Sequence, residues 1–125
     1  MKILVSGCLL GENCKYNGGN NRNGKVLQLM ADNEVITVCP EQMGGLETPR
    51  NPSERVGDRV LSCKGKDVTA QFQKGAETAL YLARLNHVSF AVFKANSPSC
   101  GKGTIYDGTF TGGKTEGNGL TTELL

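Results

Sequence analysis

The chain has 125 residues and a net charge of +2, and this length fits a single domain with one hydrophobic core. Basic and acidic side chains are mixed along the sequence, so nothing indicates a strong DNA-binding surface. The amino-terminal apolar run is too short for a signal peptide, and no later segment is long enough to span a membrane. We therefore expect a cytoplasmic protein with one domain over residues 1–125.

The first predicted strand covers residues 2–6 and runs directly into residues 7–24, a stretch rich in glycine and asparagine. This composition argues against a regular element, and the backbone amides of the stretch could form a cradle for an anion or a substrate. Two of the five cysteines, Cys8 and Cys14, lie in it. A short helix over about residues 25–30 should follow.

The second predicted strand, residues 34–38, leads into Cys39. A proline and two glycines within residues 40–45 predict an irregular path after that cysteine. Residues 55–62 predict a small β-hairpin with a two-residue turn at a Gly-Asp pair. Cys63 follows the hairpin, and we expect it to take no part in a functional site.

An amphipathic helix is predicted over residues 69–86, where apolar side chains recur at steps of three and four. It leads to a third apolar strand, residues 89–94, and a right-handed crossover would make this strand parallel to the first two. The nearly continuous apolar run predicts that the strand is covered on both faces. Cys100 follows in the loop of residues 97–101, and residues 102–119 are glycine-rich with no predicted element.

Three cysteines thus share one kind of position, on a loop that follows a predicted strand: Cys8, Cys39 and Cys100. The carboxyl ends of parallel strands meet at one edge of a sheet, so we expect these thiols to converge there. Thiolates bind zinc, copper or iron–sulfur clusters, although this spacing does not match a zinc ribbon. Three thiolates would leave one coordination position open for water or substrate. Cys14 is an alternative fourth ligand that would close the site.

Four blocks of residues occur in order and are spread over nearly the whole chain. The blocks are Ser6-x-Cys8-Leu9-Leu10-Gly11, then Tyr16-Asn17-Gly18-Gly19, then Val38-Cys39-Pro40-Glu41 with Gly44-Gly45 and Thr48-Pro49-Arg50, and finally Ser97-Pro98-Ser99-Cys100-Gly101 with Tyr106-Asp107-Gly108-Thr109-Phe110. These blocks resemble the YbbK-type family, which includes the thiouracil desulfidases. Members of that family are expected to continue past the last helix into a further strand, which this chain, ending at Leu125, would lack.

The resemblance implies an α/β, Rossmann-like three-layer fold with a mostly parallel sheet and a small β-hairpin. It also implies a 4Fe–4S cluster on Cys8, Cys39 and Cys100, with one iron free of protein ligands. In that chemistry the free iron takes the sulfur of a thiolated pyrimidine while water replaces it on the carbon, which releases sulfide. The expected partner is a small thiolated pyrimidine, with thiolated RNA as a further candidate, and the expected assembly is a monomer or homodimer.

The same chemistry assigns roles to residues near the three cysteines. Attack by water benefits from a carboxylate base, and Glu41, two residues after the second cysteine, is the best placed. Ser97 and Ser99, on the loop of the third cysteine, are candidates to hydrogen-bond the substrate ring or the cluster sulfides. Arg22 and Arg50 are either ordinary surface charges or contacts for an anionic part of the substrate, such as a phosphate. Glu41 and Ser97 are the predicted catalytic residues, and the other three are predicted substrate contacts.

Two other functions remain open from the residues alone. Three or four thiolates could hold zinc in a module that binds a ligand or a partner and has no desulfidase activity. A third possibility is a metal-free α/β domain whose cysteines are simply buried beside a nucleotide-like pocket. Protein purified without oxygen separates the first two functions, because a cluster protein is brown with acid-labile sulfide and a zinc protein is colourless.

Overall fold

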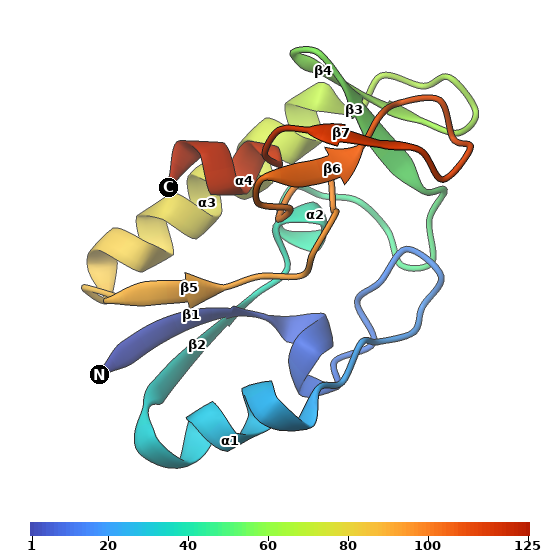
Figure 1. Cartoon of the computed structure of the whole chain (residues 1–125). Coiled ribbons are helices and arrows are strands. Elements are labelled where there is room, and N and C mark those ends of the chain that lie inside the picture. The colour runs from blue at the N-terminus through green and yellow to red at the C-terminus, as the bar shows by residue number, and fades with distance from the viewer.

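The computed structural model describes all 125 residues as a mixed α/β fold (Figure 1). A three-stranded parallel sheet is accompanied by two separate antiparallel hairpins. No helix is long and apolar enough to cross a membrane. The elements in chain order are β1 (Lys2–Ser6), the 3₁₀ turn η1 (Gly7–Leu10), α1 (Gly24–Asp32), β2 (Glu34–Val38), α2 (Pro40–Met43), β3 (Ser53–Val56), β4 (Arg59–Ser62), α3 (Thr69–Leu85), β5 (Phe90–Val92), β6 (Thr104–Tyr106), β7 (Lys114–Glu116) and α4 (Leu120–Leu124).

β1 is the middle strand of the parallel sheet, with β2 on one side and β5 on the other. Ile3, Leu4 and Val5 are fully buried, as expected of a central strand that is covered on both faces. Ser6, at the end of β1, pairs in register with Val38, at the end of β2. The residues that follow these strands therefore leave the sheet at the same edge. The predicted parallel arrangement of the three strands is confirmed.

Helices lie on opposite sides of this sheet, α3 on one side and α1 on the other (Figure 1). α3 packs Ala83 against Leu4 and Val38 of the sheet. Nearer its start, Phe72 packs against Val60 of β4. α3 thus joins the parallel sheet to the β3–β4 hairpin, and both the helix and the hairpin lie where the sequence predicts them.

α2 approaches α3 closely through two glycines. A Cβ atom on Gly44 would overlap the carbonyl oxygen of Gln71, and one on Gly75 would overlap the carbonyl oxygen of Pro40. Neither overlap involves a flexible side chain that could move away. This contact fixes the start of α2 and, with it, Cys39, which directly precedes Pro40.

We expect Gly75→Ala to lower the free energy of unfolding by about 2–3 kcal/mol, because the added methyl group forces two helix backbones apart. Gly24→Ala is the matched control, since Gly24 is also helical and has no atom near its Cβ position. Urea unfolding midpoints of the two variants test the prediction. Equal midpoints would contradict the close contact between α2 and α3.

Two stretches that are predicted to be irregular contain short helical turns. Residues 40–43 form α2, in which Pro40 occupies the first helical position, where its missing N–H costs nothing. Residues 7–10 form η1, which ends at Gly11 in a left-handed conformation with φ of 98°. The glycines and the proline mark the ends of these turns. The prediction of an irregular path is wrong for residues 7–10 and 40–43, and it is confirmed for residues 11–23, which form no helix or strand.

The third strand and the carboxyl-terminal region also differ from the prediction. β5 pairs only with β1, so it is an edge strand, and Phe90 is 42% exposed instead of covered on both faces. Within the stretch 102–119, β6 and β7 form an antiparallel hairpin. These strands have three residues each and no apolar alternation, which explains why no pattern in the sequence predicts them.

Candidate active site

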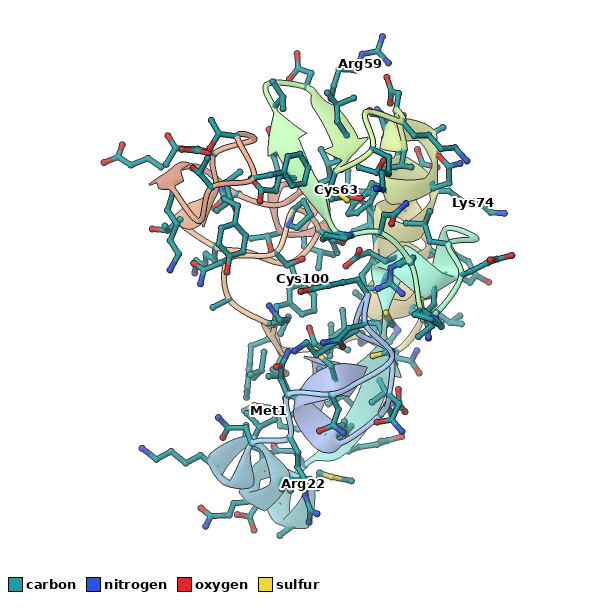
Figure 2. All side chains as sticks on the ribbon, turned by 90° about the vertical axis from the view of Figure 1, so that its right-hand side faces the viewer. Met1, Arg22, Arg59, Cys63, Lys74 and Cys100 are labelled. Atoms are coloured by element: carbon teal, nitrogen blue, oxygen red, sulfur yellow. The ribbon has the colours of Figure 1, made fainter.

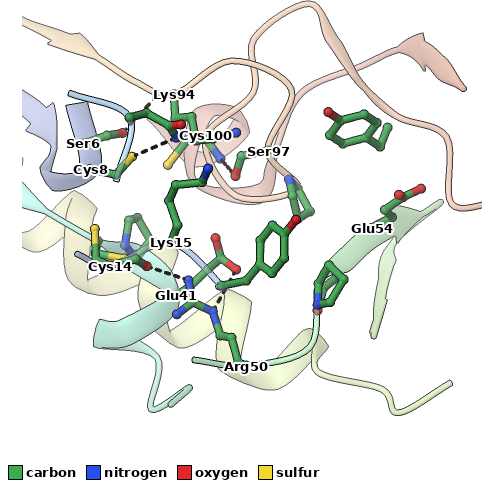
Figure 3. A pocket seen from close by; sticks show the side chains of 18 of the residues that line it. Ser6, Cys8, Cys14, Lys15, Glu41, Arg50, Glu54, Lys94, Ser97 and Cys100 are labelled. Atoms are coloured by element: carbon green, nitrogen blue, oxygen red, sulfur yellow. Dashed lines mark hydrogen bonds and ion pairs between the residues drawn. The ribbon is translucent and has the colours of Figure 1, made fainter. Parts of the chain in front are cut away.

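A cavity of about 410 Å³ opens at the edge of the sheet where the parallel strands end (Figure 3). Its walls come from the segments after β1, β2 and β5, and also from β3 and the β6–β7 hairpin. Four of the five cysteines line it: Cys8, Cys14, Cys39 and Cys100. The predicted convergence of three thiols is therefore observed, and a fourth thiol joins them. Cys63 is exposed and lies outside the cavity.

Cys8 and Cys39 are held near the ends of β1 and β2 by the first turns of η1 and α2. Cys14 returns from the loop between β1 and α1 and hydrogen-bonds the thiols of both. Cys8 and Cys39 accept these hydrogen bonds, which favour their thiolate forms. The pKa of Cys8 is lowered to about 6 and the pKa of Cys39 to about 7. The same contacts raise the pKa of Cys14. A thiol has one proton, so Cys14 stabilises one thiolate neighbour at a time.

Cys100 lies in a tight turn that two hydroxyl groups hold in place. The Oγ atom of Ser97 accepts hydrogen bonds from the backbone N–H groups of Ser99 and Cys100, both at 3.0 Å. Thr122 of α4 donates its hydroxyl to the carbonyl oxygen of Cys100 at 2.8 Å. Burial raises the pKa of the Cys100 thiol to about 12. This thiol therefore stays protonated unless a cation, such as an iron or zinc ion, compensates its charge.

Glu41 faces the same cavity and forms an ion pair with Arg50, whose Nε atom lies 3.4 Å from its Oε1 atom. Burial raises the pKa of Glu41, while the positive charges of Arg50 and Lys94 oppose this rise. A carboxylate with a raised pKa is a stronger base than an ordinary exposed one. The position and the environment of Glu41 therefore suit a general base.

The Arg50 side chain is almost fully buried, and its guanidinium group donates its hydrogen bonds to protein acceptors, not to a substrate anion. Besides Glu41, it donates to the carbonyl oxygen of Cys14 at 2.9 Å, to Thr48 Oγ1 at 2.8 Å and to the carbonyl oxygen of Glu47 at 3.2 Å. It thereby ties the Cys14 loop to the segment after α2. This environment favours a positioning role over the predicted contact with an anionic substrate.

The other predicted site residues divide between the cavity and places outside it. Ser97 lines the cavity, and its own hydroxyl proton remains available. Ser99 is fully buried outside the cavity, and its hydroxyl is paired with Thr121 at 2.7 Å. Arg22 is exposed, does not line the cavity, and lies well away from Cys100 in Figure 2. The cavity walls thus include one of the two predicted serines and one of the two predicted arginines.

Several lining residues were not predicted. Lys15, Tyr16 and Lys94 lie on the same segments as the cysteines, so their closeness in sequence to Cys14 and Cys100 could have indicated that they line the cavity. The backbone N–H of Lys94 donates to Ser6 Oγ at 3.1 Å, which ties the end of β5 to the end of β1. Glu54 comes from the β3–β4 hairpin, and no pattern in the sequence connects it with the thiols.

The arrangement of the four thiols bears on whether the cavity suits a single metal ion or a cluster. No group of three or more His, Cys, Asp or Glu side chains converges closely enough to hold one ion. Instead, four thiols surround a cavity that opens to the outside, and the hydrogen bond from Cys14 lowers the pKa of either Cys8 or Cys39. Thiolates that hold an iron–sulfur cluster bind different iron atoms, so they need not meet at one point. The thiols therefore fit a cluster better than a mononuclear zinc site.

Comparisons with known proteins agree with this arrangement. A family model described as 2-thiouracil desulfurase matches residues 3–125. The uncharacterized protein YbbK of Bacillus subtilis (strain 168) is 40% identical and is matched over 98% of this chain and 88% of its own length. A solved structure described as the 4Fe–4S-dependent thiouracil desulfidase TudS is 46% identical, with a TM-score of 0.93 over 98% of this chain and 83% of that one.

Proposed function

The chain belongs to the 2-thiouracil desulfurase family, and from this premise we propose that it removes the sulfur of a thiolated uracil as sulfide, with a 4Fe–4S cluster. Cys8, Cys39 and Cys100 would hold the cluster. The observation that carries the proposal is the meeting of these thiols with Glu41 in one open cavity at the sheet edge. The described substrate and cofactor of the similar structure support the same conclusion.

The proposed reaction exchanges the thiocarbonyl sulfur for the oxygen of water, so that thiouracil and water give uracil and hydrogen sulfide without net oxidation or reduction. When bound, the cluster supplies a soft iron site without a protein ligand, which attracts the thiocarbonyl sulfur. Glu41 accepts a proton from the water that attacks the ring carbon. Arg50 holds the Glu41 carboxylate in the cavity wall. Ser97 donates its free hydroxyl proton to a ring oxygen or nitrogen.

The finer architecture is part of the same proposal. Helices on opposite sides of a parallel sheet support a Rossmann-like three-layer fold, and we assign residues 1–125 to one cluster-binding domain. The substrate that suits a cavity of about 410 Å³ is a small molecule with a single pyrimidine ring.

The experiment that tests the function is an anaerobic purification followed by three measurements on one sample. Iron and acid-labile sulfide should be present, the thione absorbance of 2-thiouracil should fall, and sulfide should be released in equal amount to the uracil that forms. Colourless protein that contains zinc and leaves thiouracil unchanged would overturn the proposal.

We expect Cys14→Ala to keep the cluster, because the three proposed ligands remain. The iron-to-protein ratio after reconstitution should match that of the unmodified protein. The removal of Cys14 takes away the hydrogen bonds to Cys8 and Cys39, so slower reconstitution is also expected. Loss of most of the iron would identify Cys14 as a fourth ligand and would contradict an open iron site.

A further inference from the structure

The end of the cavity opposite the thiols is formed by an aromatic turn that the proposed chemistry does not use. Tyr106, Phe110 and Gly112 of the β6–β7 hairpin line this end, together with Glu54 of β3. Figure 3 shows Glu54 across the cavity from Cys8 and Cys14. The turn thus belongs to the same cavity as the thiols, although it comes from a different part of the fold.

Glu54 anchors this turn to β3. Its side chain is buried, with the residue only 8% exposed, and its Oε1 atom accepts hydrogen bonds from two backbone N–H groups of the turn. The donors are Gly108 at 3.0 Å and Phe110 at 3.2 Å. Gly108 itself lies directly on β3, since a Cβ atom there would stand 2.6 Å from Val56 Cγ2. The turn is therefore fixed against β3 by the Glu54 carboxylate and by the close approach of Gly108 to the Val56 side chain.

Phe110 is held in a conformation that a phenylalanine does not adopt on its own. Its φ of 58° lies in the left-handed region, which is unfavourable for a residue with a side chain. The hydrogen bond to Glu54 offsets this cost, and Asp107 adds one from Thr109 N at 3.0 Å. The carboxylates of Glu54 and Asp107 thus accept hydrogen bonds from three consecutive backbone N–H groups of the turn. Strained residues that the surroundings hold in place concentrate at functional sites.

The side chain of Phe110 presents an apolar surface to the cavity instead of entering the core. It is 37% exposed and lines the cavity wall. The other aromatic residue of this hairpin, Tyr106, already has the Lys114 ammonium 5.8 Å from its ring centroid. The polar groups of a thiouracil all lie on the edge of its flat ring, so an aromatic side chain can pack against the face of the ring.

We propose that Phe110 is the wall on which the substrate's pyrimidine ring packs, and that Glu54 is a positioning residue that holds Phe110 there. This inference rests on the proposed function for the identity of the ring. The thiols take the sulfur side of the substrate, and Phe110 supports the ring from the other end of the cavity. The β6–β7 turn is thereby a specificity element for flat heterocycles.

The first test replaces the ring and keeps an apolar side chain. Phe110→Leu should raise KM for 2-thiouracil about tenfold and leave kcat within about twofold, since leucine removes the aromatic face on which the ring stacks. Phe90→Leu is the matched control, because Phe90 is similarly exposed and lies on β5 outside this cavity. An unchanged KM for Phe110→Leu, or an equal change for Phe90→Leu, would overturn the assignment of Phe110.

The second test separates positioning by Glu54 from general stability. Glu54→Ala should raise KM as Phe110→Leu does and should speed hydrogen exchange at the Gly108 and Phe110 amides. Glu54→Gln keeps an acceptor oxygen and should restore most of both properties. The double variant Glu54→Ala with Phe110→Leu should have the KM of the single variants. Full additivity would overturn the positioning role, as would unchanged hydrogen exchange at both amides. Glu77→Ala on α3 is the control for loss of a glutamate.

Uracil binding distinguishes failure of this inference from failure of the proposed function. Calorimetry with uracil, the unreactive product, on the iron-reconstituted protein needs no turnover. Weaker uracil binding in both Phe110→Leu and Glu54→Ala would support the inference even if thiouracil were not consumed. Equal affinity in these variants and in the unmodified protein, or no uracil binding at all, would overturn it while leaving the sulfide measurement to decide the function.

Discussion

Cys39→Ala is expected to abolish cluster retention, so that the iron-to-protein ratio after anaerobic reconstitution falls to nearly zero. Cys39 directly precedes α2, whose position against α3 is fixed by Gly44 and Gly75, so its thiol is held at one place in the cavity wall. With Cys39 removed, two of the three proposed ligands remain, and the cluster would have two irons without a protein ligand. Cys8→Ala and Cys100→Ala should have the same effect.

Cys63→Ala is the matched control for this experiment, because Cys63 is an exposed cysteine outside the cavity. It should keep the iron content and the brown colour of the unmodified protein. Far-ultraviolet circular dichroism of each variant before reconstitution distinguishes loss of the ligand from loss of the fold. Equal iron in folded Cys39→Ala and in the unmodified protein would remove Cys39 from the ligand set.

Glu41→Gln is expected to keep the fold and the cluster and to lose most of the turnover of 2-thiouracil. Glutamine has nearly the same size and can still accept a hydrogen bond from Arg50, but it cannot take a proton from water. Loss of a general base typically costs ~10²–10⁴-fold in rate. Sulfide release and loss of thione absorbance should be followed together, on samples with matched iron content.

Glu47→Gln is the control for this substitution, since Glu47 lies on the same segment, is exposed, and does not line the cavity. It should turn over thiouracil at the unmodified rate. If Glu41→Gln also keeps that rate, Glu41 serves only to hold Arg50, and the water is activated elsewhere in the cavity. A parallel loss of iron in Glu41→Gln would instead indicate a structural role at the cluster.

The central part of the site could be predicted because each of its thiols follows a strand that the local sequence defines. The apolar runs before Cys8 and Cys39 indicate buried strands, and the helix before the third strand requires a parallel crossover. These local signals are sufficient to bring the loops to one edge. They do not decide what each side chain on a loop faces. Ser99 shows this, because its hydroxyl is paired with Thr121, 22 residues further on, and the residue does not line the cavity.

The sequence by itself therefore determined the parallel strands and the edge at which the loops of Cys8, Cys39 and Cys100 meet, since the hydrophobic pattern of each strand and helix is a property of a short segment. Only the tertiary structure decided that Cys14 joins the other thiols, that Arg50 is used up by protein acceptors, and that Glu54 fixes Phe110 at the far end. These contacts join residues that are remote in sequence. Their geometry depends on how the hairpins and helices pack around the sheet, and a local pattern of residue types does not predict that packing.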